Sequence, residues 1–205
     1  MIHPTAIIKH INDSIGYGVF ATEFIPEGTI VYVKDSLEIE ISPQDYQSHS
    51  EIMQKAIEKY SYIDQRGYRI VSWDFAKYVN HCCHPNSIST GYGFEIAIRD
   101  ISAGEEITDE YGIFNLERNM EVSCGKTECR KILKNEDFEN YYQAWDLIIK
   151  KTLRKIDRVD QPLFPFIDSE TVHVIQQFIK YNNTYKSVYA LRNLQMLAHV
   201  NGQQK

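Results

Sequence analysis

The sequence has no long hydrophobic run. Its longest apolar stretches, such as Ile25 to Val33 and Leu147 to Ile149, are short or interrupted by charge, whereas a membrane-spanning helix needs roughly 20 apolar residues. The start of the chain, Met1 to Thr5, also lacks the basic region, apolar stretch and cleavage site of a secretory signal. We therefore expect no membrane partner and an intracellular protein, with the cytoplasm favoured and the nucleus as the alternative.

The sequence also has no excess of basic residues. It holds 22 Lys and Arg against 28 Asp and Glu, a formal net charge of -6. Binding to phosphate groups needs clustered Lys and Arg, so this balance argues against direct nucleic-acid binding and suits a protein or peptide substrate with a basic segment. With 205 residues and 43% hydrophobic content, the chain can bury a full core as one domain, or as one domain with a smaller helical appendage.

Cysteine is scarce, and its placement matters more than its number. The four cysteines form two tight groups, Cys82-Cys83 and Cys124 with Cys129. In a reducing compartment this grouping favours metal ligation or free thiols over disulfides. The four-residue gap between Cys124 and Cys129 falls within the spacing of zinc sites, and Gly125 lets that loop turn. Cys83 would supply a third ligand, and the fourth would be Cys82, a nearby histidine or water.

Short strands and turns are predicted for the first part of the chain. Apolar residues alternate or cluster up to about Ile41, and Pro26 to Thr29 indicates a tight turn that enters a buried strand at Ile30 to Val33. Ser42 is placed to cap a helix whose first residue is Pro43. We therefore expect a helical segment between Pro43 and Tyr60.

The spacing of apolar residues then changes from a pattern typical of strands to one typical of helices. Strand-like segments are expected at 60–63, 68–72, 94–98 and 106–111, the last of which ends in Tyr111. After Lys134 the apolar residues are spaced at three and four, which predicts helices over 138–156 and from Asp168 to about Ala198, with a hinge at 162–166.

Polar and glycine-rich motifs lie between these elements. Gly16-Tyr17-Gly18 suits close approach of the backbone to a ligand, although a hairpin turn explains it equally well. Asn80 and His81 can hold a polar ligand, and the alternative is that Asn80 and Asn86 only satisfy buried backbone groups. Tyr111 can direct its hydroxyl into a cleft, or it can be an ordinary half-buried core residue.

Taken together and in order, four motifs resemble the SET domain of protein lysine methyltransferases: Gly16-Tyr17-Gly18, Asn80 to Asn86, Gly104 to Gly112, and Cys124-(x4)-Cys129-Arg130. The resemblance covers roughly residues 5 to 133. It implies a mainly β fold, a SET-type β-clip of small curved sheets with a pseudoknot, plus a C-terminal helical tail, so α+β overall. The implied segments are a SET domain at 1–121 with a helical insert at about 43–60, a degenerate post-SET-like cysteine segment at 122–133, and a helical region at 134–205.

The resemblance also implies S-adenosylmethionine as cofactor and a lysine ε-amine of a protein or peptide as methyl acceptor. Tyr111 and Tyr62 take the catalytic positions. The implied cofactor-binding residues are Gly16, Tyr17, Gly18, Asn80, His81 and Tyr111. The implied lysine channel is lined by Tyr62, Asp109 and Phe114.

Two departures from the family pattern carry consequences. Asp109 stands where the family has Phe or Tyr, so the number of methyl groups transferred is open and a non-catalytic SET-fold module that binds S-adenosylmethionine or a basic peptide is the alternative function. Val122 replaces one cysteine of the family's zinc-binding tail, which leaves Cys83, Cys124 and Cys129 as the implied zinc ligands.

Two further hypotheses concern parts of the chain outside these motifs. The helical tail would close over the channel, with Trp145, Phe164 or Phe166 as lids, or it would serve packing or homodimer contact. A metal-hydrolase site made of His81 to His84 is disfavoured, because adjacent residues on an extended loop point in opposite directions.

Overall fold

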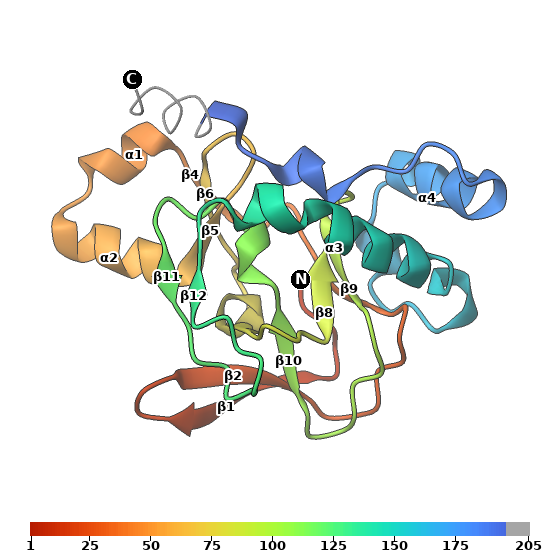
Figure 1. The fold of residues 1–205 in the computed structure, drawn as a ribbon, viewed down its shortest axis with the longest axis horizontal. Helices are drawn as coiled ribbons and strands as arrows, with labels where there is room; N and C mark the ends of the chain where they lie inside the picture. The colour runs from red at the N-terminus through yellow and green to blue at the C-terminus, as the bar shows by residue number, and fades with distance from the viewer. Residues whose placement is uncertain (196–205) are drawn as a thin grey trace.

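The computed structural model describes residues 1–195, which form several small sheets with helices toward the left and the right of the view (Figure 1). The first sheet has the strand order β1 (Ala6–Asn12), β2 (Gly16–Ala21), β10 (Glu106–Asp109) and β7 (Asn80–His81). The second has the order β3 (Ile30–Val33), β9 (Phe94–Ala97) and β8 (Ser87–Ser89). The third has the order β4 (Ile39–Ile41), β6 (Arg69–Val71) and β5 (Ser61–Ile63), and a separate pair joins β11 (Met120–Glu121) to β12 (Ile132–Leu133).

The helices divide into an insert and a tail. The insert consists of α1 (Pro43–Ser48) and α2 (Glu51–Tyr60), and the tail contains α3 (Asp137–Leu153) and α4 (Ser169–Tyr181). Short 3-10 helices occur at Phe75–Tyr78, Tyr111–Ile113, Ile156–Arg158, Phe164–Phe166 and Val188–Leu191. This confirms a mainly β fold with a helical C-terminal part.

Local signals explain where the insert and the tail helices begin. The Ser42 hydroxyl accepts a hydrogen bond from the Asp45 amide at 3.1 Å, and Pro43 is the first helical residue, as its fixed φ favours. Asp168 caps α4 in the same way by accepting from the Thr171 amide at 2.8 Å. Both helix starts are as predicted, and the insert is two short helices rather than one.

Two predicted boundaries are wrong. The strand that was expected to end at Tyr111 ends at Asp109, and Tyr111 begins a short 3-10 helix. The second tail helix ends at Tyr181, because Asn182 adopts the left-handed conformation with φ 56° and donates its backbone amide to the Phe178 carbonyl, a common helix stop. The last residues of that predicted helix, 196–198, lie outside the described residues.

The strand pairing that matters for function joins β10 to β7. These two strands run parallel, with Thr108 opposite Asn80 and Asp109 opposite His81. The pairing places the residues that follow β10 beside the residues that follow β7. Two loops that are far apart in the sequence therefore meet at one place.

Two hydrophobic clusters hold the sheets and the tail together. One lies around β1, β2 and β10 and includes Val19 and Ile107, which are fully buried. The other combines β3, β8 and β9 with the tail, so that Ile96 of the sheet shares a cluster with Phe138 and Phe178 of the tail helices. The tail is therefore packed on the sheets through a common core. None of the helices within residues 1–195 has the length and apolar character needed to cross a membrane.

Candidate active site

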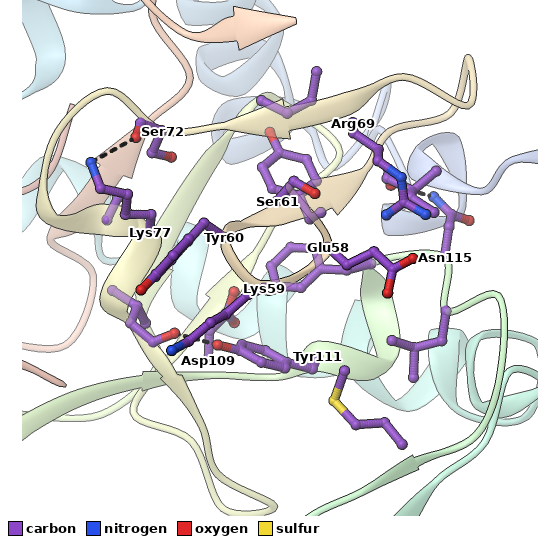
Figure 2. Close-up of a pocket in the computed structure, with 18 of the residues that line it drawn as sticks. Glu58, Lys59, Tyr60, Ser61, Arg69, Ser72, Lys77, Asp109, Tyr111 and Asn115 are labelled. Atoms are coloured by element: carbon purple, nitrogen blue, oxygen red, sulfur yellow. Dashed lines mark hydrogen bonds between the residues drawn. The ribbon is translucent and has the colours of Figure 1, made fainter. Parts of the chain in front are cut away.

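The first cavity, of about 370 Å³, lies between the insert, β5 and the turn after β10 (Figure 2). Aromatic side chains make up one part of its wall, and charged and polar groups make up the rest. Its lining includes Tyr32, Tyr60, Tyr62, Lys77, Val79, Glu95, Asp109, Tyr111, Phe114 and Asn115. The predicted channel residues Tyr62, Asp109 and Phe114 therefore share one cavity with Tyr111.

Tyr111 is held at this cavity by both its backbone and its hydroxyl. Its hydroxyl donates to the Val79 carbonyl at 2.5 Å, just before β7. The ring packs against Phe114 on one side and His81 on the other, with centroid distances of 5.6 and 5.5 Å. Burial, followed by the nearby Asp109 carboxyl, raises the pKa of Tyr111 above its ordinary value, so the phenol keeps its proton at neutral pH.

Tyr62 and Phe114 form a shared wall between this cavity and a second one of about 310 Å³. Their rings are 5.1 Å apart between centroids. Tyr32, Ile63, Glu95 and Asn115 also line both cavities. An elongated side chain of a ligand could thus lie along the aromatic wall that Tyr62 and Phe114 form.

The glycine motif lies beside the cavity rather than in its lining. Gly18 is packed so closely that a Cβ atom there would come within 2.4 Å of the Glu106 carboxylate and 3.0 Å of the Asn80 amide. The Asn80 side-chain nitrogen donates to the Tyr17 carbonyl at 3.0 Å and to Glu106 at 2.8 Å. The structure therefore brings Asn80 to the glycine motif, as the resemblance implies. The amide nitrogen is used within the protein, which leaves the amide oxygen for a ligand.

Asn86 has the structural role that was considered as the alternative. It is fully buried, its nitrogen donates to the Glu106 carbonyl at 2.7 Å, and its oxygen accepts from the Thr108 amide at 2.8 Å. This side chain fastens β10 to the loop after β7. It supports the site without being available to a ligand.

His81 links the two loops that the strand pairing brings together. Its Nδ1 atom lies 3.1 Å from the Asp109 carbonyl and 3.3 Å from the Tyr111 amide nitrogen, and its Nε2 atom lies 3.3 Å from the Cys83 sulfur. Burial, together with the positive charge of Arg130, lowers the pKa of His81 to about 4. The imidazole is therefore neutral at pH 7.

Lys77 places a positive charge at the cavity. Its ammonium group donates to the backbone carbonyls of Ser72 and Trp73, each at 3.4 Å (Figure 2). These long bonds to neutral oxygens leave a cation that suits a ligand carboxylate. Nearby, the rings of Tyr17, Tyr78 and Tyr60 follow one another at centroid distances of 5.9 and 5.6 Å, from the glycine motif to the cavity.

Three cysteines converge close to this site. The sulfur atoms of Cys83, Cys124 and Cys129 all lie within 4.8 Å of one another, and those of Cys83 and Cys129 are 4.0 Å apart. A tetrahedral zinc with Zn–S bonds of about 2.3 Å separates its sulfur ligands by roughly 3.8 Å, so the spacing fits this metal. Burial acts to raise the pKa of Cys124, but hydrogen bonds from the backbone of Cys83 and Lys126 and from the neighbouring thiols bring it to about 6.

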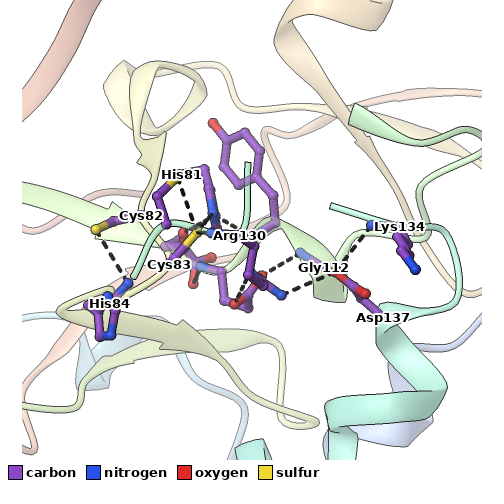
Figure 3. A network of polar contacts seen from close by, with 12 residues as sticks. His81, Cys82, Cys83, His84, Gly112, Arg130, Lys134 and Asp137 are labelled. Atoms are coloured by element: carbon purple, nitrogen blue, oxygen red, sulfur yellow. Dashed lines mark hydrogen bonds and ion pairs between the residues drawn. The ribbon is translucent and has the colours of Figure 1, made fainter. Parts of the chain in front are cut away.

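Cys82 does not belong to this group among the described residues. Its sulfur accepts from the His84 amide at 3.4 Å, and Figure 3 shows Cys82 and Cys83 on different sides of the loop. This is the alternation expected of neighbouring residues in extended chain.

Arg130 ties the cysteine segment to the turn after β10 (Figure 3). Its guanidinium contacts both carboxylate oxygens of Glu110 at 2.6 Å and the Asp137 carboxylate at 3.1 Å. Its backbone amide donates to the Cys83 sulfur at 3.3 Å. The cysteine segment, the Tyr111 turn and the start of α3 thus form one connected network.

Comparison with known proteins agrees with this arrangement. Residues 16–112 match the model of the SET domain, a segment that includes the glycine motif, β7, the Asn86 loop and Tyr111. Residues 16–112 are therefore a SET domain. The chain is 34% identical over 137 residues to the variant-silencing SET domain-containing protein of Plasmodium falciparum (isolate 3D7). This match covers 57% of this chain and 5% of that protein. The chain is 38% identical over 65 residues to the histone-lysine N-methyltransferase trithorax of Drosophila melanogaster, which covers 28% of this chain and 2% of that protein.

The SET domain contains site residues that the sequence reasoning missed. Tyr60, Lys77 and Glu95 line the first cavity without having been assigned a role. Tyr60 and Lys77 adjoin motifs that were recognised, so proximity was a usable signal. Glu95 was detectable as a lone charge inside an apolar strand segment.

The tail contacts this site of the SET domain in a different way from the one expected. Trp145 is buried against Phe138 and Gly112, and neither it nor Phe164 nor Phe166 is among the residues that line the two cavities. The prediction that one of these three aromatic side chains closes over the channel is wrong. The tail instead contributes Asp168, Thr171, Lys186, Ala190 and Leu191 to the lining of the second cavity.

Proposed function

We propose that this SET-domain protein is an S-adenosylmethionine-dependent protein-lysine N-methyltransferase. The observation that carries the proposal is the position of the Tyr111 hydroxyl, at an aromatic cavity with Tyr62 and Phe114 and directly beside the Asn80–His81 strand. The printed name of the trithorax relative, a histone-lysine N-methyltransferase, supports the same class of reaction.

The residues around the cavity fit the chemical groups of this cofactor. Lys77 suits its carboxylate, the amide oxygen of Asn80 suits its ammonium group, and the tyrosine rings at the cavity edge suit flat or cationic parts of a ligand. When bound, S-adenosylmethionine supplies a methyl group on a positively charged sulfur. The three-cysteine cluster would hold a zinc ion through Cys83, Cys124 and Cys129 and so order the neighbouring segment.

The chain's own residues then have three tasks in the reaction. A lysine amine has a reference pKa near 10.4, so keeping it neutral at pH 7 costs on the order of 4 to 5 kcal/mol. The rings of Tyr62 and Phe114 exclude water and disfavour the ammonium form. Since the hydroxyl proton of Tyr111 is donated to Val79, its oxygen lone pairs are free to orient the amine for in-line attack.

The acceptor would be a protein or peptide with a basic segment, because the chain has a net charge of -6. Electrostatic complementarity of this kind raises association rates and sets orientation more than it raises affinity. The sheet that contains β5 ends in strands with an unpaired edge, β4 on one side and β5 on the other, and either edge could pair with an extended substrate.

The test compares the wild-type chain with Tyr111→Phe on a mixed peptide array with labelled S-adenosylmethionine. We expect label on lysine in the wild type and at least about a 100-fold loss of turnover in the variant, because an orienting group in the transition state is removed. Tyr181→Phe, on the exposed face of α4, is the matched control and should keep full turnover. Equal turnover by both variants, or cofactor binding without transfer by the wild type, would contradict the proposal.

A non-catalytic SET-fold module is the second candidate, because one observation favours it. Asp109 is a buried acid at a place where the family has an aromatic ring, and an altered channel is one way to lose transfer while binding is kept. The same array separates the two functions, since the module would bind S-adenosylmethionine or a basic peptide without labelling it.

A further inference from the structure

A row of polar side chains crosses the β3–β9–β8 sheet and faces the cavity. Glu95 on the central strand lies directly opposite Tyr32 on β3 and Ser89 on β8. Directly opposed residues share one face of a sheet, and the next residue along the strand points to the other face. That next residue, Ile96, is fully buried with Ile30 and Ile88, so Glu95 occupies the polar side of an otherwise apolar sheet.

A second carboxylic acid lies behind Glu95. Asp109, at the end of β10, is 1% exposed, and its oxygens accept from the Glu110 amide at 2.7 Å and the Ser89 hydroxyl at 3.2 Å. The same hydroxyl lies 3.4 Å from the Glu95 carboxylate. A hydroxyl has one proton to donate, so Ser89 cannot satisfy both acids.

Burial disfavours the ionised form of both acids. Burial raises the pKa of Glu95 to about 7, and burial together with the Glu95 charge raises the pKa of Asp109 well above its ordinary value. Phenols, further acids and one distant amino group act on the pair from other elements: Tyr62, Tyr111, Glu38, Glu110 and the N-terminus at Met1. Cations also line the first cavity together with the pair, namely Lys59, Arg69, Lys77 and Arg118.

Glu95 can be reached from the cavity, and Asp109 is shielded behind it. Glu95 is only partly buried and lines both cavities, whereas Asp109 lines the first with almost no exposed surface. Figure 2 shows Asp109 at the same end of the cavity as Tyr111. The acid pair therefore lies where the proposed reaction would take place.

The proposed reaction needs an acceptor for one proton at this place. A lysine enters as an ammonium ion, and only the neutral amine can attack carbon. The phenols of Tyr32, Tyr62 and Tyr111 cannot serve, because burial raises the pKa of each and keeps it protonated. A carboxylate with a pKa near neutrality can accept the proton and release it again.

Building on the proposed function, we propose that Glu95 is the catalytic base that takes the proton of the substrate ammonium, and that Asp109 is the residue that positions it. One N–H bond breaks and leaves its electron pair on nitrogen, while an O–H bond forms on Glu95. That electron pair forms the new N–C bond as the C–S bond breaks with its electrons going to sulfur. The proton passes from Glu95 to water when the products leave.

The test follows methyl transfer from pH 6 to 10 with the peptide that the wild type labels best. Glu95→Gln should lower kcat at pH 7 by at least about 50-fold and recover near pH 10, where solution supplies the free amine, with little change in KM. Asp109→Asn should move the rising limb of the rate to higher pH with a smaller loss, because Asp109 acts to lower the pKa of Glu95. Asp157→Asn, an exposed acid of the tail, is the control and should follow the wild type.

The outcomes distinguish this inference from the proposed function. An active wild type with parallel pH profiles for all four proteins overturns the role of the acid pair and leaves the methyltransferase function standing. A wild type that transfers no methyl group at any pH overturns both. Should Glu95→Gln fail to fold, an unshifted profile for folded Asp109→Asn is sufficient to overturn the proposal.

Discussion

Two buried acidic sites in this molecule differ in how their charges are satisfied. Asp146 on α3 is 7% exposed, and its oxygens accept from the Tyr185 hydroxyl at 2.6 Å, the Ser187 hydroxyl at 2.6 Å and the Val188 amide at 2.9 Å. Three donors from one segment thus surround a single carboxylate. This arrangement fastens the end of the tail to α3.

The Glu95–Asp109 pair has the opposite arrangement. Two acids share one side-chain hydroxyl, and the charge of Glu95 raises the electrostatic cost of ionising Asp109. Like-charge pairs that the fold does not neutralise are typical of functional sites, where stability is given up for chemistry. The comparison separates a carboxylate that stabilises the fold from a pair whose ionisation destabilises it.

The largest effect on stability is expected from removing the satisfied carboxylate. Asp146→Ala leaves two hydroxyls and one amide without their partner, which should lower the free energy of unfolding by about 2–4 kcal/mol. Asp146→Asn keeps an acceptor and is the matched control, with a smaller loss. Urea unfolding followed by circular dichroism measures both. A loss below that of Asp146→Asn would show that the contacts of Asp146 do not fasten the tail.

For the unsatisfied pair, removing an acid is expected to raise the free energy of unfolding at high pH. The pKa of Glu95 is higher in the folded state than in the unfolded state. Its contribution to the free energy of unfolding is therefore present below its unfolded pKa near 4.5 and is lost as pH rises toward 7. Glu95→Gln, which cannot ionise, should therefore be more stable than the wild type at pH 8, by on the order of 1–3 kcal/mol. At pH 4.5 the two proteins should be close in stability.

Unfolding by urea at the two pH values checks this expectation. Glu105→Gln is the useful comparison, because hydrogen bonds from Arg99, Ser102 and Asn86 outweigh burial and lower the pKa of Glu105. Its stability difference should run the other way, with a loss that is larger at pH 8 than at pH 4.5. A Glu95→Gln protein that is no more stable at pH 8 than the wild type would remove the distinction between the two kinds of acid.

Much of the fold could be predicted because it depends on local signals. The Ser42 and Asp168 caps, the turn at Pro26 to Thr29 and the apolar run at Ile30 to Val33 are each written in neighbouring residues. The two-residue strand β7 is different. Its pairing with β10 exists only when segments 28 residues apart meet, and no local pattern carries that information.

The site shows the same division between local and long-range information. The cysteine spacing and the glycine motif pointed to Cys124, Cys129 and Gly18 within single short segments. Glu95 and Asp109 come from different strands of different sheets, and only the register of those strands makes them neighbours. Their pairing could not be predicted from a lone acid in each segment.

The smallest effect on stability is expected from the cysteine segment, which has neither a satisfied acid nor an extended core of its own. Of the β11–β12 pair only Leu133 is buried, so an ion held by the three cysteines would stabilise a surface segment. We expect about one zinc per chain in the purified protein, and a fall in Tm of about 2–4 °C when a chelator removes it. Cys83→Ser should bind no stoichiometric zinc and should show no further shift with chelator. A wild type that is free of zinc and has an unchanged Tm would show that the thiols stabilise this segment without a metal, and the contrast between the two acid sites would then be the main electrostatic feature of the fold.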